Sequence, residues 1–219
     1  MRARLAATAA VLGVHAVCLR DGFVDFDDDV IFLDNPLLRR TDLGALTEIL
    51  SLDRPDWRPL RDVSHWLDFL IHGQDPFFAH LHNLVLLGIV VWLAGGVLAA
   101  LGRGGPWGAF ALFVGFAHPV QVESVAWVSG RKELLAGVAF FALLRAFLAF
   151  VDGRRRALSA LAVVACFVLG VMAKGHVVVA PAVMALLWAH QRLRGPVEWR
   201  AAAALTAAGS LYLADAAGG

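Results

Sequence analysis

The chain has 219 residues, of which 59% are hydrophobic and 17% charged, and its formal net charge is +1. Soluble domains usually carry about 25% charged residues, so this low share indicates an all-α, polytopic membrane protein. The near-zero net charge argues against nucleic acid as a partner. The two cysteines, Cys18 and Cys166, lie within apolar runs and are expected to be buried thiols.

A helix that spans the membrane needs roughly 20 mostly apolar residues. By this criterion the sequence predicts a bundle of about seven spans within one module, residues 1–219. The last run is short and ends near Ala-Gly-Gly, so we expect the module to be truncated at its C-terminus. The predicted runs are Leu5–Leu19, Leu81–Leu101, Trp107–Ala117, Leu134–Val151, Ala157–Ala173, Val177–Ala189 and Ala201–Leu213.

Positive charges orient these spans, because Lys and Arg in short loops favour the cytoplasmic side. With Arg2 and Arg4 placed inside, Arg103 and the two later arginine-rich connections (154–156 and 192–200) also fall inside. The acidic first loop, the stretch His118–Glu133 and the turn 174–176 then fall outside. The Ala-, Gly- and Arg-rich composition is typical of high-GC bacterial genes. We therefore expect a multi-pass protein of a bacterial inner membrane with a cytoplasmic N-terminus.

Between the first two spans lies a long mixed segment, residues 21–78, which we expect to be an exported loop. Thr41 or Asp42 could cap a short helix in it. A second amphipathic helix is predicted over Pro59–His72, with its apolar residues at helical spacing on one side. Both helices are expected to lie flat in the membrane interface. The alternative is a small soluble subdomain.

Three consecutive carboxylates, Asp27, Asp28 and Asp29, follow the first span closely. Such a cluster could supply a general base toward a hydroxyl group. It could also bind a hard divalent metal ion. An ordinary solvated acidic loop is the third interpretation, and the residues alone leave all three open.

Cations on the expected outer side are candidates for neutralising a phosphate. Arg131 and Lys132 begin a span, and they could instead be interfacial residues that extend their charges toward water. Lys174 and His176 interrupt an apolar stretch and could equally form an ordinary turn between helices. Arg58, in front of the second amphipathic helix, is a further candidate anion partner.

Two other segments hold polar residues that could contact a substrate. His80 and Asn83 are three positions apart and share one face of a helix. His118 ends a span, and Glu123 follows it in the exported connection. His118 and Glu123 lack the spacing of a His- or Cys-based zinc site.

Several of these segments resemble the transmembrane and tetratricopeptide-repeat-containing O-mannosyltransferase-like family. The matching motifs are Asp21–Val30 with Asp34-Asn35-Pro36, Trp57-Arg58-Pro59-Leu60, His80-Leu81-His82-Asn83 and, most specifically, His118–Glu133. The resemblance covers about residues 21–190 and is closest through Glu123-Ser124-Val125-Ala126-Trp127-Val128-Ser129-Gly130-Arg131-Lys132-Glu133.

The resemblance implies a GT-C glycosyltransferase fold that uses a lipid-phosphate sugar, with mannose as the family's sugar and a protein hydroxyl group as acceptor. The family's catalytic carboxylate maps onto Asp27 or Asp28. Two departures put activity in doubt: Gly175 stands where the family usually has Glu after Lys174, and the repeats that normally follow are absent. The need for a divalent metal is left open.

A non-catalytic remnant, a scaffold or a transporter is the rival interpretation. A transporter should carry ionisable residues at the bilayer midplane. Here almost all of them lie at predicted span ends, and Arg145 is the main exception. This distribution favours an enzyme that works at the membrane surface.

Overall fold

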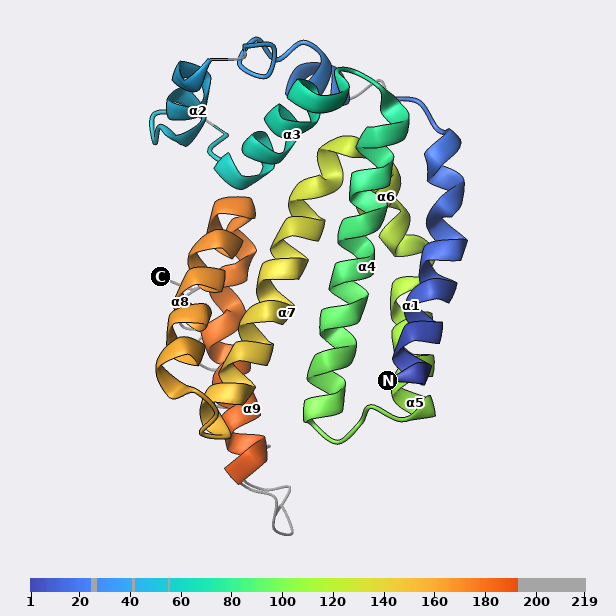
Figure 1. The fold of residues 1–219 in the computed structure, drawn as a ribbon, viewed down its shortest axis with the longest axis vertical. Coiled ribbons are helices and arrows are strands. Elements are labelled where there is room, and N and C mark those ends of the chain that lie inside the picture. Colours follow the sequence, from blue (N-terminus) through green and yellow to red (C-terminus); the bar gives the residue numbers. More distant parts are fainter. Residues whose placement is uncertain (25–26, 41, 55, 193–219) are drawn as a thin grey trace, which may run out of the picture. The chain divides into compact units, whose positions relative to one another are not determined.

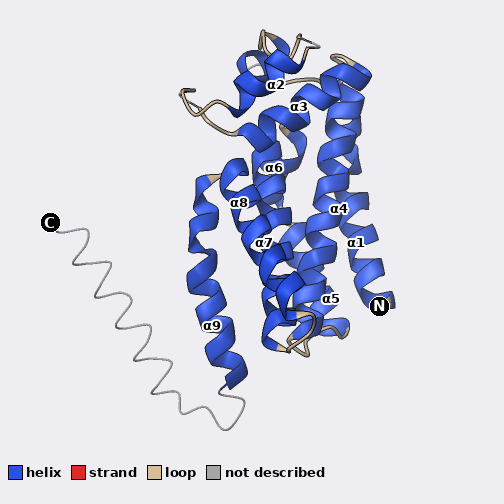
Figure 2. Cartoon of the chain, turned by 60° about the vertical axis from the view of Figure 1, so that its left-hand side comes forward, coloured by secondary structure: helices blue, strands red, loops and turns tan. Residues whose placement is uncertain are grey.

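The structure, a computed structural model, describes residues 1–192 apart from 25–26, 41 and 55. Within these ranges every regular element is a helix (Figures 1 and 2), as the composition predicted. The chain divides into two compact units, Met1–Ala180 and Pro181–Gly219. Helix α9 (Ala180–Arg192) is the described part of the second unit, and all other elements belong to the first.

Four helical segments are long and apolar enough to cross a membrane, which supports a membrane protein. They are α1 (Arg2–His15) with its 3-10 continuation η1 (Ala16–Arg20), α4 (Pro76–Ala100), the 3-10 turn η4 (Val128–Gly130) with α7 (Arg131–Val151), and α8 (Arg156–Ala173). α4 is capped by Asp75, whose side chain accepts a hydrogen bond from the Phe77 N–H.

The predicted run Trp107–Ala117 does not form a complete span by itself. Helix α5 (Pro106–Phe116) has 11 residues, about 16 Å of rise, which is half the hydrocarbon thickness. After a break come η3 (Pro119–Gln121) and α6 (Val122–Ala126), bent by 57° from α5, and the two halves together could make one broken span. Part of the expected outer connection is therefore helix, interrupted where proline lacks the N–H that a continuous helix needs.

The candidate spans number four, or five with the bent pair, in the part of the chain that the structure describes. Of the remaining predicted runs, Val177–Ala189 is divided between η5 (Gly175–Val179) and the 13-residue helix α9, which is too short to qualify. The run Ala201–Leu213 lies outside the described residues. The prediction of about seven spans is thus confirmed only in its coarser form, an all-helical membrane bundle.

The segment between α1 and α4 contains η2 (Asp29–Leu33) and two α-helices, α2 (Leu43–Leu50) and α3 (Pro59–His72). Asp42 caps α2 by accepting a hydrogen bond from the Ala45 N–H at 3.1 Å. A hydrogen bond from Arg40, reinforced by that cap, holds the pKa of Asp42 at about 2. Thr41, the other predicted cap, lies outside the described residues.

Helix α3 has the predicted limits, and it buries its polar side. Arg61, Asp62 and His65 are at most 2% exposed, whereas Ile71 is 68% exposed. The exposed apolar side, with Leu67 and Leu70, is available for lipid, in keeping with an interfacial helix. On this buried side Asp68 pairs with His82 of α4 and Arg131 of α7. Arg61 and Asp62 pair with each other and with Asp56 and Arg54 of the segment before α3.

Two groups of buried apolar side chains hold the first unit together. One joins α1, α4, α5, α6 and α7 around Val11, Leu87 and Val125. The other joins the first loop to α2, α3, α4 and η4 around Phe32 and Trp66. Trp66 also donates its indole N–H to the Arg40 carbonyl at 2.7 Å. The second group fixes the loop that carries the acidic cluster.

We predict that Gly170→Leu destabilises the first unit, because η5 and α7 both approach α8 closely at this glycine. A Cβ atom at Gly170 would lie 2.7 Å from Val177 Cγ1 and 3.3 Å from Ala139 Cβ. Overpacking of this kind typically costs about 1–3 kcal/mol. Denaturation in detergent should show a lower midpoint than Gly13→Leu, since a Cβ at Gly13 meets nothing within 4 Å. Equal midpoints would contradict the close packing.

Candidate functional site

Asp28 joins the first loop to the start of the η4–α7 segment. Its side chain is fully buried. One carboxylate oxygen accepts hydrogen bonds from the Ser129 N–H at 2.8 Å and the Ser129 hydroxyl at 2.5 Å. The other accepts from the Val24 N–H at 3.1 Å. These donors occupy both oxygens, so the carboxylate holds the loop in place.

Arg131 is a second buried anchor, 1% exposed. Its guanidinium donates to Asn83 Oδ1 at 2.8 Å and to the Ala79 carbonyl at 3.0 Å, and it pairs with Asp68 at 2.5 Å. A weaker contact reaches the Ser64 carbonyl. Because protein partners surround its guanidinium group, Arg131 binds α3 and α4 to α7 and faces no open space.

The predicted pair His80 and Asn83 belongs to the same scaffold. Both are fully buried. Asn83 donates to the Val125 and Trp127 carbonyls, at 3.2 and 3.1 Å, which supports the broken backbone between α6 and η4. His80 Nε2 lies 3.3 Å from the Gly22 carbonyl. These two residues therefore position the loop and the connection after α6.

Asp27 and Lys132 remain accessible beside these anchors. Both are partly exposed. Asp27 lies within electrostatic range of the Lys132 ammonium, together with the like charges of Arg58 and Arg61. The Lys132 ammonium also lies over the Trp127 ring, 5.2 Å from its centroid. An acid of the first loop and cations of α3 and α7 thus converge at one place.

A ladder of ion pairs supports this cationic group from α3. Arg61 pairs with Asp62 at 2.7 Å and with Asp56 at 2.8 Å, and Arg54 pairs with Asp62 at 2.5 Å. Burial opposes ionisation of Arg61, but the two carboxylates outweigh it and raise the Arg61 pKa. Arg58 pairs with Asp56 at 2.9 Å and is 33% exposed, so an anion can reach it.

Lys174 joins the same end of the unit through a residue that the sequence interpretation missed. Its ammonium donates to Glu133, which also acts on the charge of the neighbouring Lys132. The charges therefore continue from α7 to the end of α8. The sequence did not reveal the role of Glu133 because its partner, Lys174, lies 41 positions away. The only local signal was its position directly after the two cations Arg131 and Lys132.

A hollow of about 460 Å³ opens next to this charged group. It is lined by Val24, Val122, Glu123, Ala126 and Trp127. Trp127 is shared between the hollow wall and the contact with Lys132. The predicted residue Glu123 contributes an exposed carboxylate at the rim, so a mostly apolar recess adjoins an acid and several cations.

No hydrogen bond or ion pair in the described part of the chain joins the predicted residues His118 and His176 to this charged group. His118 is exposed and caps η3, with its Nδ1 accepting from the Val120 N–H at 3.2 Å. His176 is exposed within η5.

Among the described residues no three His, Cys, Asp or Glu side chains converge as a metal site. Asp28, one of the three consecutive carboxylates Asp27, Asp28 and Asp29, already accepts three hydrogen bonds from protein donors and so is not free to bind a metal ion in this geometry.

His65 is an internal residue that the sequence did not single out. It is fully buried, and neither ring nitrogen has a hydrogen-bond partner within the described structure. Its ring packs against Phe32 at 5.2 Å between centroids. Burial, followed by the charges of Arg131, Arg61 and Lys132, lowers the pKa of His65 well below its ordinary value of 6.5. The folded protein therefore keeps this imidazole neutral.

This neutral imidazole predicts loss of stability in acid. Below pH 6.5 the unfolded chain binds a proton at His65 that the folded chain excludes, so the free energy of unfolding falls as pH falls. The slope is up to about 1.4 kcal/mol per pH unit. Denaturation curves between pH 7 and 5 measure how the free energy of unfolding changes with pH. In His65→Phe this change should be smaller by the contribution of one bound proton, because the variant has no imidazole at this position. An unchanged slope would contradict the assignment.

Asp28 and Asp27 should separate in their effects on stability. Asp28→Ala leaves the buried Val24 and Ser129 donors without an acceptor, and each such group costs about 1–3 kcal/mol. Asp27→Ala, at a partly exposed position, should be close to neutral. Denaturation midpoints in detergent measure both. Equal stability of the two variants would show that Asp28 is not the clamp.

Comparison with known proteins finds relatives by sequence but no matching solved structure. No family model and no solved structure matches the chain. It is 34% identical over 152 residues to Protein O-mannosyl-transferase Tmtc1 of Drosophila melanogaster, covering 64% of this chain and 17% of that protein. It is 30% identical over 110 residues to Protein O-mannosyl-transferase tmtc2 of Xenopus laevis, covering 50% and 13%. The chain thus spans about a sixth of the length of these relatives, and its similarity to the TMTC1 and TMTC2 protein O-mannosyl-transferases covers about half to two thirds of its own length.

Proposed function

We propose that this chain carries the donor side of a membrane glycosyltransferase. It would transfer a hexose from a polyprenyl phosphate to a hydroxyl group of a protein, at the membrane face opposite the cytoplasm. The names of the relatives supply mannose and the protein acceptor. The single observation that supports the proposal is the convergence of Asp27 with Lys132 and Arg58, three residues from separate segments.

The charge arrangement suits a phosphate leaving group. Lys132 and Arg58 are like charges beside one another and partly exposed, so an anion placed between them relieves their repulsion. The exposed Arg58–Asp56 pair is worth little by itself and can exchange for a phosphate. Arg61 and Arg131, by contrast, are committed to buried partners and serve as positioning residues.

In the proposed reaction the acceptor oxygen attacks the anomeric carbon of the sugar. The new carbon–oxygen bond forms as the bond to the phosphate oxygen breaks, and that bond's electron pair leaves with the phosphate. Asp27 takes the proton of the acceptor hydroxyl. Lys132 and Arg58 stabilise the charge that grows on the phosphate. Attack from the face opposite the leaving group inverts the anomeric configuration.

The recess beside Trp127 is the proposed place for the reacting groups. Its apolar wall, with Glu123 at the rim, can hold a sugar ring or an acceptor side chain next to the cations. Asp28 supports this arrangement from the adjacent position, because its hydrogen bonds to Ser129 keep the loop against η4. Asp27 is accordingly the preferred base of the two candidate carboxylates.

Substitution of Asp27 by Asn tests the base. Transfer of mannose from polyprenyl-phosphate mannose to a peptide, assayed in membranes containing the chain, should fall about 100-fold or more. Folding should be retained, since Asp27 is partly exposed. The matched control is Asp53→Asn, at an exposed carboxylate of the same segment. Transfer by Asp27→Asn at the control's rate would remove this carboxylate from the mechanism.

The cations have a separate test. Lys132→Gln and Arg58→Gln should each lower transfer about 100-fold and weaken binding of the phosphate-linked donor. Arg39→Gln removes an equal charge from an exposed pair with Asp34 and should leave both measurements unchanged. If donor binding is lost equally in all three variants, general surface charge explains it and a specific phosphate site does not.

A further inference from the structure

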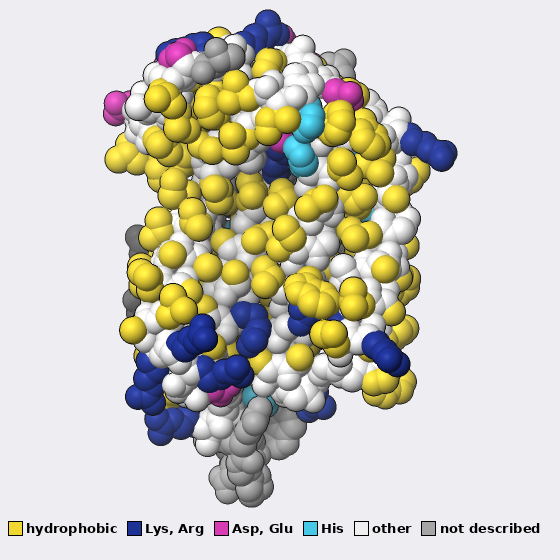
Figure 3. Space-filling model, in the orientation of Figure 1, with side chains coloured by type: hydrophobic (Ala, Val, Ile, Leu, Met, Phe, Trp, Pro, Cys, Tyr) yellow, Lys and Arg dark blue, Asp and Glu magenta, His cyan; other side chains and the backbone are white. Residues whose placement is uncertain are grey.

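The opposite end of the first unit carries a second group of cations. In both ribbon views the N-terminus and the connections α4–α5 and α7–α8 lie at this end, away from α3 (Figures 1 and 2). Figure 3 shows Lys and Arg side chains gathered there below a broad hydrophobic surface. The arginines at these positions are Arg2, Arg4, Arg103, Arg145, Arg154, Arg155 and Arg156.

Two of these arginines meet over the glycines of α4. A Cβ atom at Gly96 would lie 3.3 Å from Arg145 Nε and 3.3 Å from Arg4 Nη1. A Cβ at Gly95 would lie 2.6 Å from Arg4 Cδ. The Gly95–Gly96 pair therefore leaves the space in which a cation from α1 and a cation from α7 come together.

Arg4 and Arg145 make no ion pair with any residue of the described structure. The Arg4 guanidinium instead lies 3.3 Å from the centroid of the Trp92 ring, and its Nε is buried without a hydrogen-bond acceptor. Two like charges this close, at the edge of a low-dielectric region, repel one another. An anion between them would supply both the missing acceptor and the missing charge.

The depth of the pair matches the headgroup region of a bilayer. Arg145, the main exception to charges at predicted span ends, precedes Val151, the end of α7, by only six residues. Gly96 precedes Ala100, the end of α4, by four. At 1.5 Å per residue these positions lie about 6–9 Å from the helix ends. A charge so near the end of a span reaches the lipid headgroups, where phosphates are the available anions.

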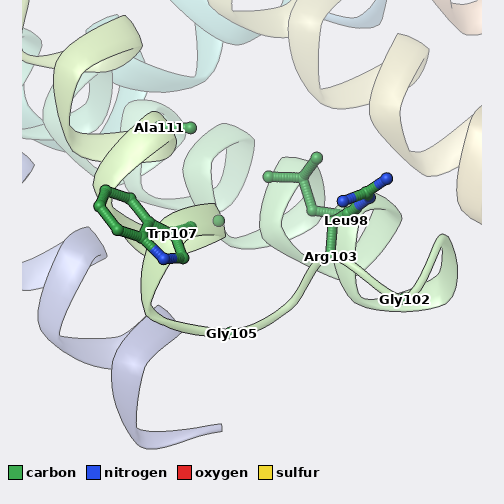
Figure 4. Close-up of a pocket in the computed structure, with 7 residues that line it drawn as sticks. Leu98, Gly102, Arg103, Gly105, Trp107 and Ala111 are labelled. Carbon is green, nitrogen blue, oxygen red and sulfur yellow. The ribbon is translucent and has the colours of Figure 1, made fainter.

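An adjoining hollow gives room for the rest of a headgroup. It measures about 390 Å³ between the end of α4 and the start of α5, with Arg103 and the exposed ring of Trp107 on its sides (Figure 4). A small cavity that includes Arg4 shares Leu98 and Gly108 with this hollow. The cavity beside Arg4 and the hollow are therefore neighbours along α4 and α5.

We propose that Arg4 and Arg145 bind the phosphate of an anionic glycerophospholipid. The lipid belongs to the leaflet at the N-terminal end, with Arg103 and Trp107 beside its glycerol and headgroup. The abundance of arginine at this end is typical of the cytoplasmic side, where anionic lipids attract it. The site is separate from Asp27 and Lys132 and does not depend on the proposed transferase activity.

The test measures lipid binding and thermal stability of the purified 219-residue chain in neutral-lipid bicelles. Addition of phosphatidylglycerol, in place of phosphatidylcholine, should raise the midpoint of unfolding. Arg4→Gln with Arg145→Gln should weaken phosphatidylglycerol binding about tenfold or more, because charge-assisted hydrogen bonds are lost. The control Arg2→Gln with Arg155→Gln removes the same charge from the same end and should retain binding.

Each other outcome counts against the proposal. Equal binding by the two double variants would show unspecific attraction to the basic surface and overturn the site. A stabilisation by inorganic phosphate equal to that by phosphatidylglycerol would assign the pair to a soluble anion. If the double variant does not fold, Arg145→Gln alone is compared with Arg155→Gln, and equal affinities again overturn the proposal.

Discussion

The burial of one guanidinium group, that of Arg131, governs the arrangement of the helices around the site. A charge held 1% exposed needs partners on every side, and it obtains them from Asp68 on α3 and from Asn83 and Ala79 on α4. Satisfying these bonds turns the polar side of α3 inward. The apolar side is thereby left facing outward, where a membrane surface can cover it.

Charged residues at this end divide into those that build the scaffold and those that remain available. Asp28 is bound by Ser129 and Val24, and Arg61 by its two carboxylates, so neither can meet a substrate without breaking buried bonds. Asp27 adjoins Asp28 in the sequence and Lys132 adjoins Arg131, so a buried neighbour fixes the position of each. Preorganisation of this kind lets a charge act without rearrangement during a reaction.

The sequence predicted the helical class and the limits of α3 correctly, because apolar spacing and proline punctuation are local signals. It did not predict which cations would be buried. Arg131 and Lys132 are neighbours with similar chemistry, and their different roles depend on Asn83 and Asp68, which lie 48 and 63 positions away. The break after α5 was likewise read as a loop, since local composition does not distinguish a broken span from a connection.

The cations at the two ends of the first unit have different kinds of partner. Around α3 nearly every arginine has a carboxylate partner, so the protein itself neutralises the cations there. Around Gly96, Arg4 and Arg145 have an aromatic ring and each other. In the proposed lipid site an anion from outside the chain would neutralise this cation pair, and near a helix end the lipid phosphates are the available anions. The partners of the arginines, in addition to their number, therefore distinguish the two ends of the first unit.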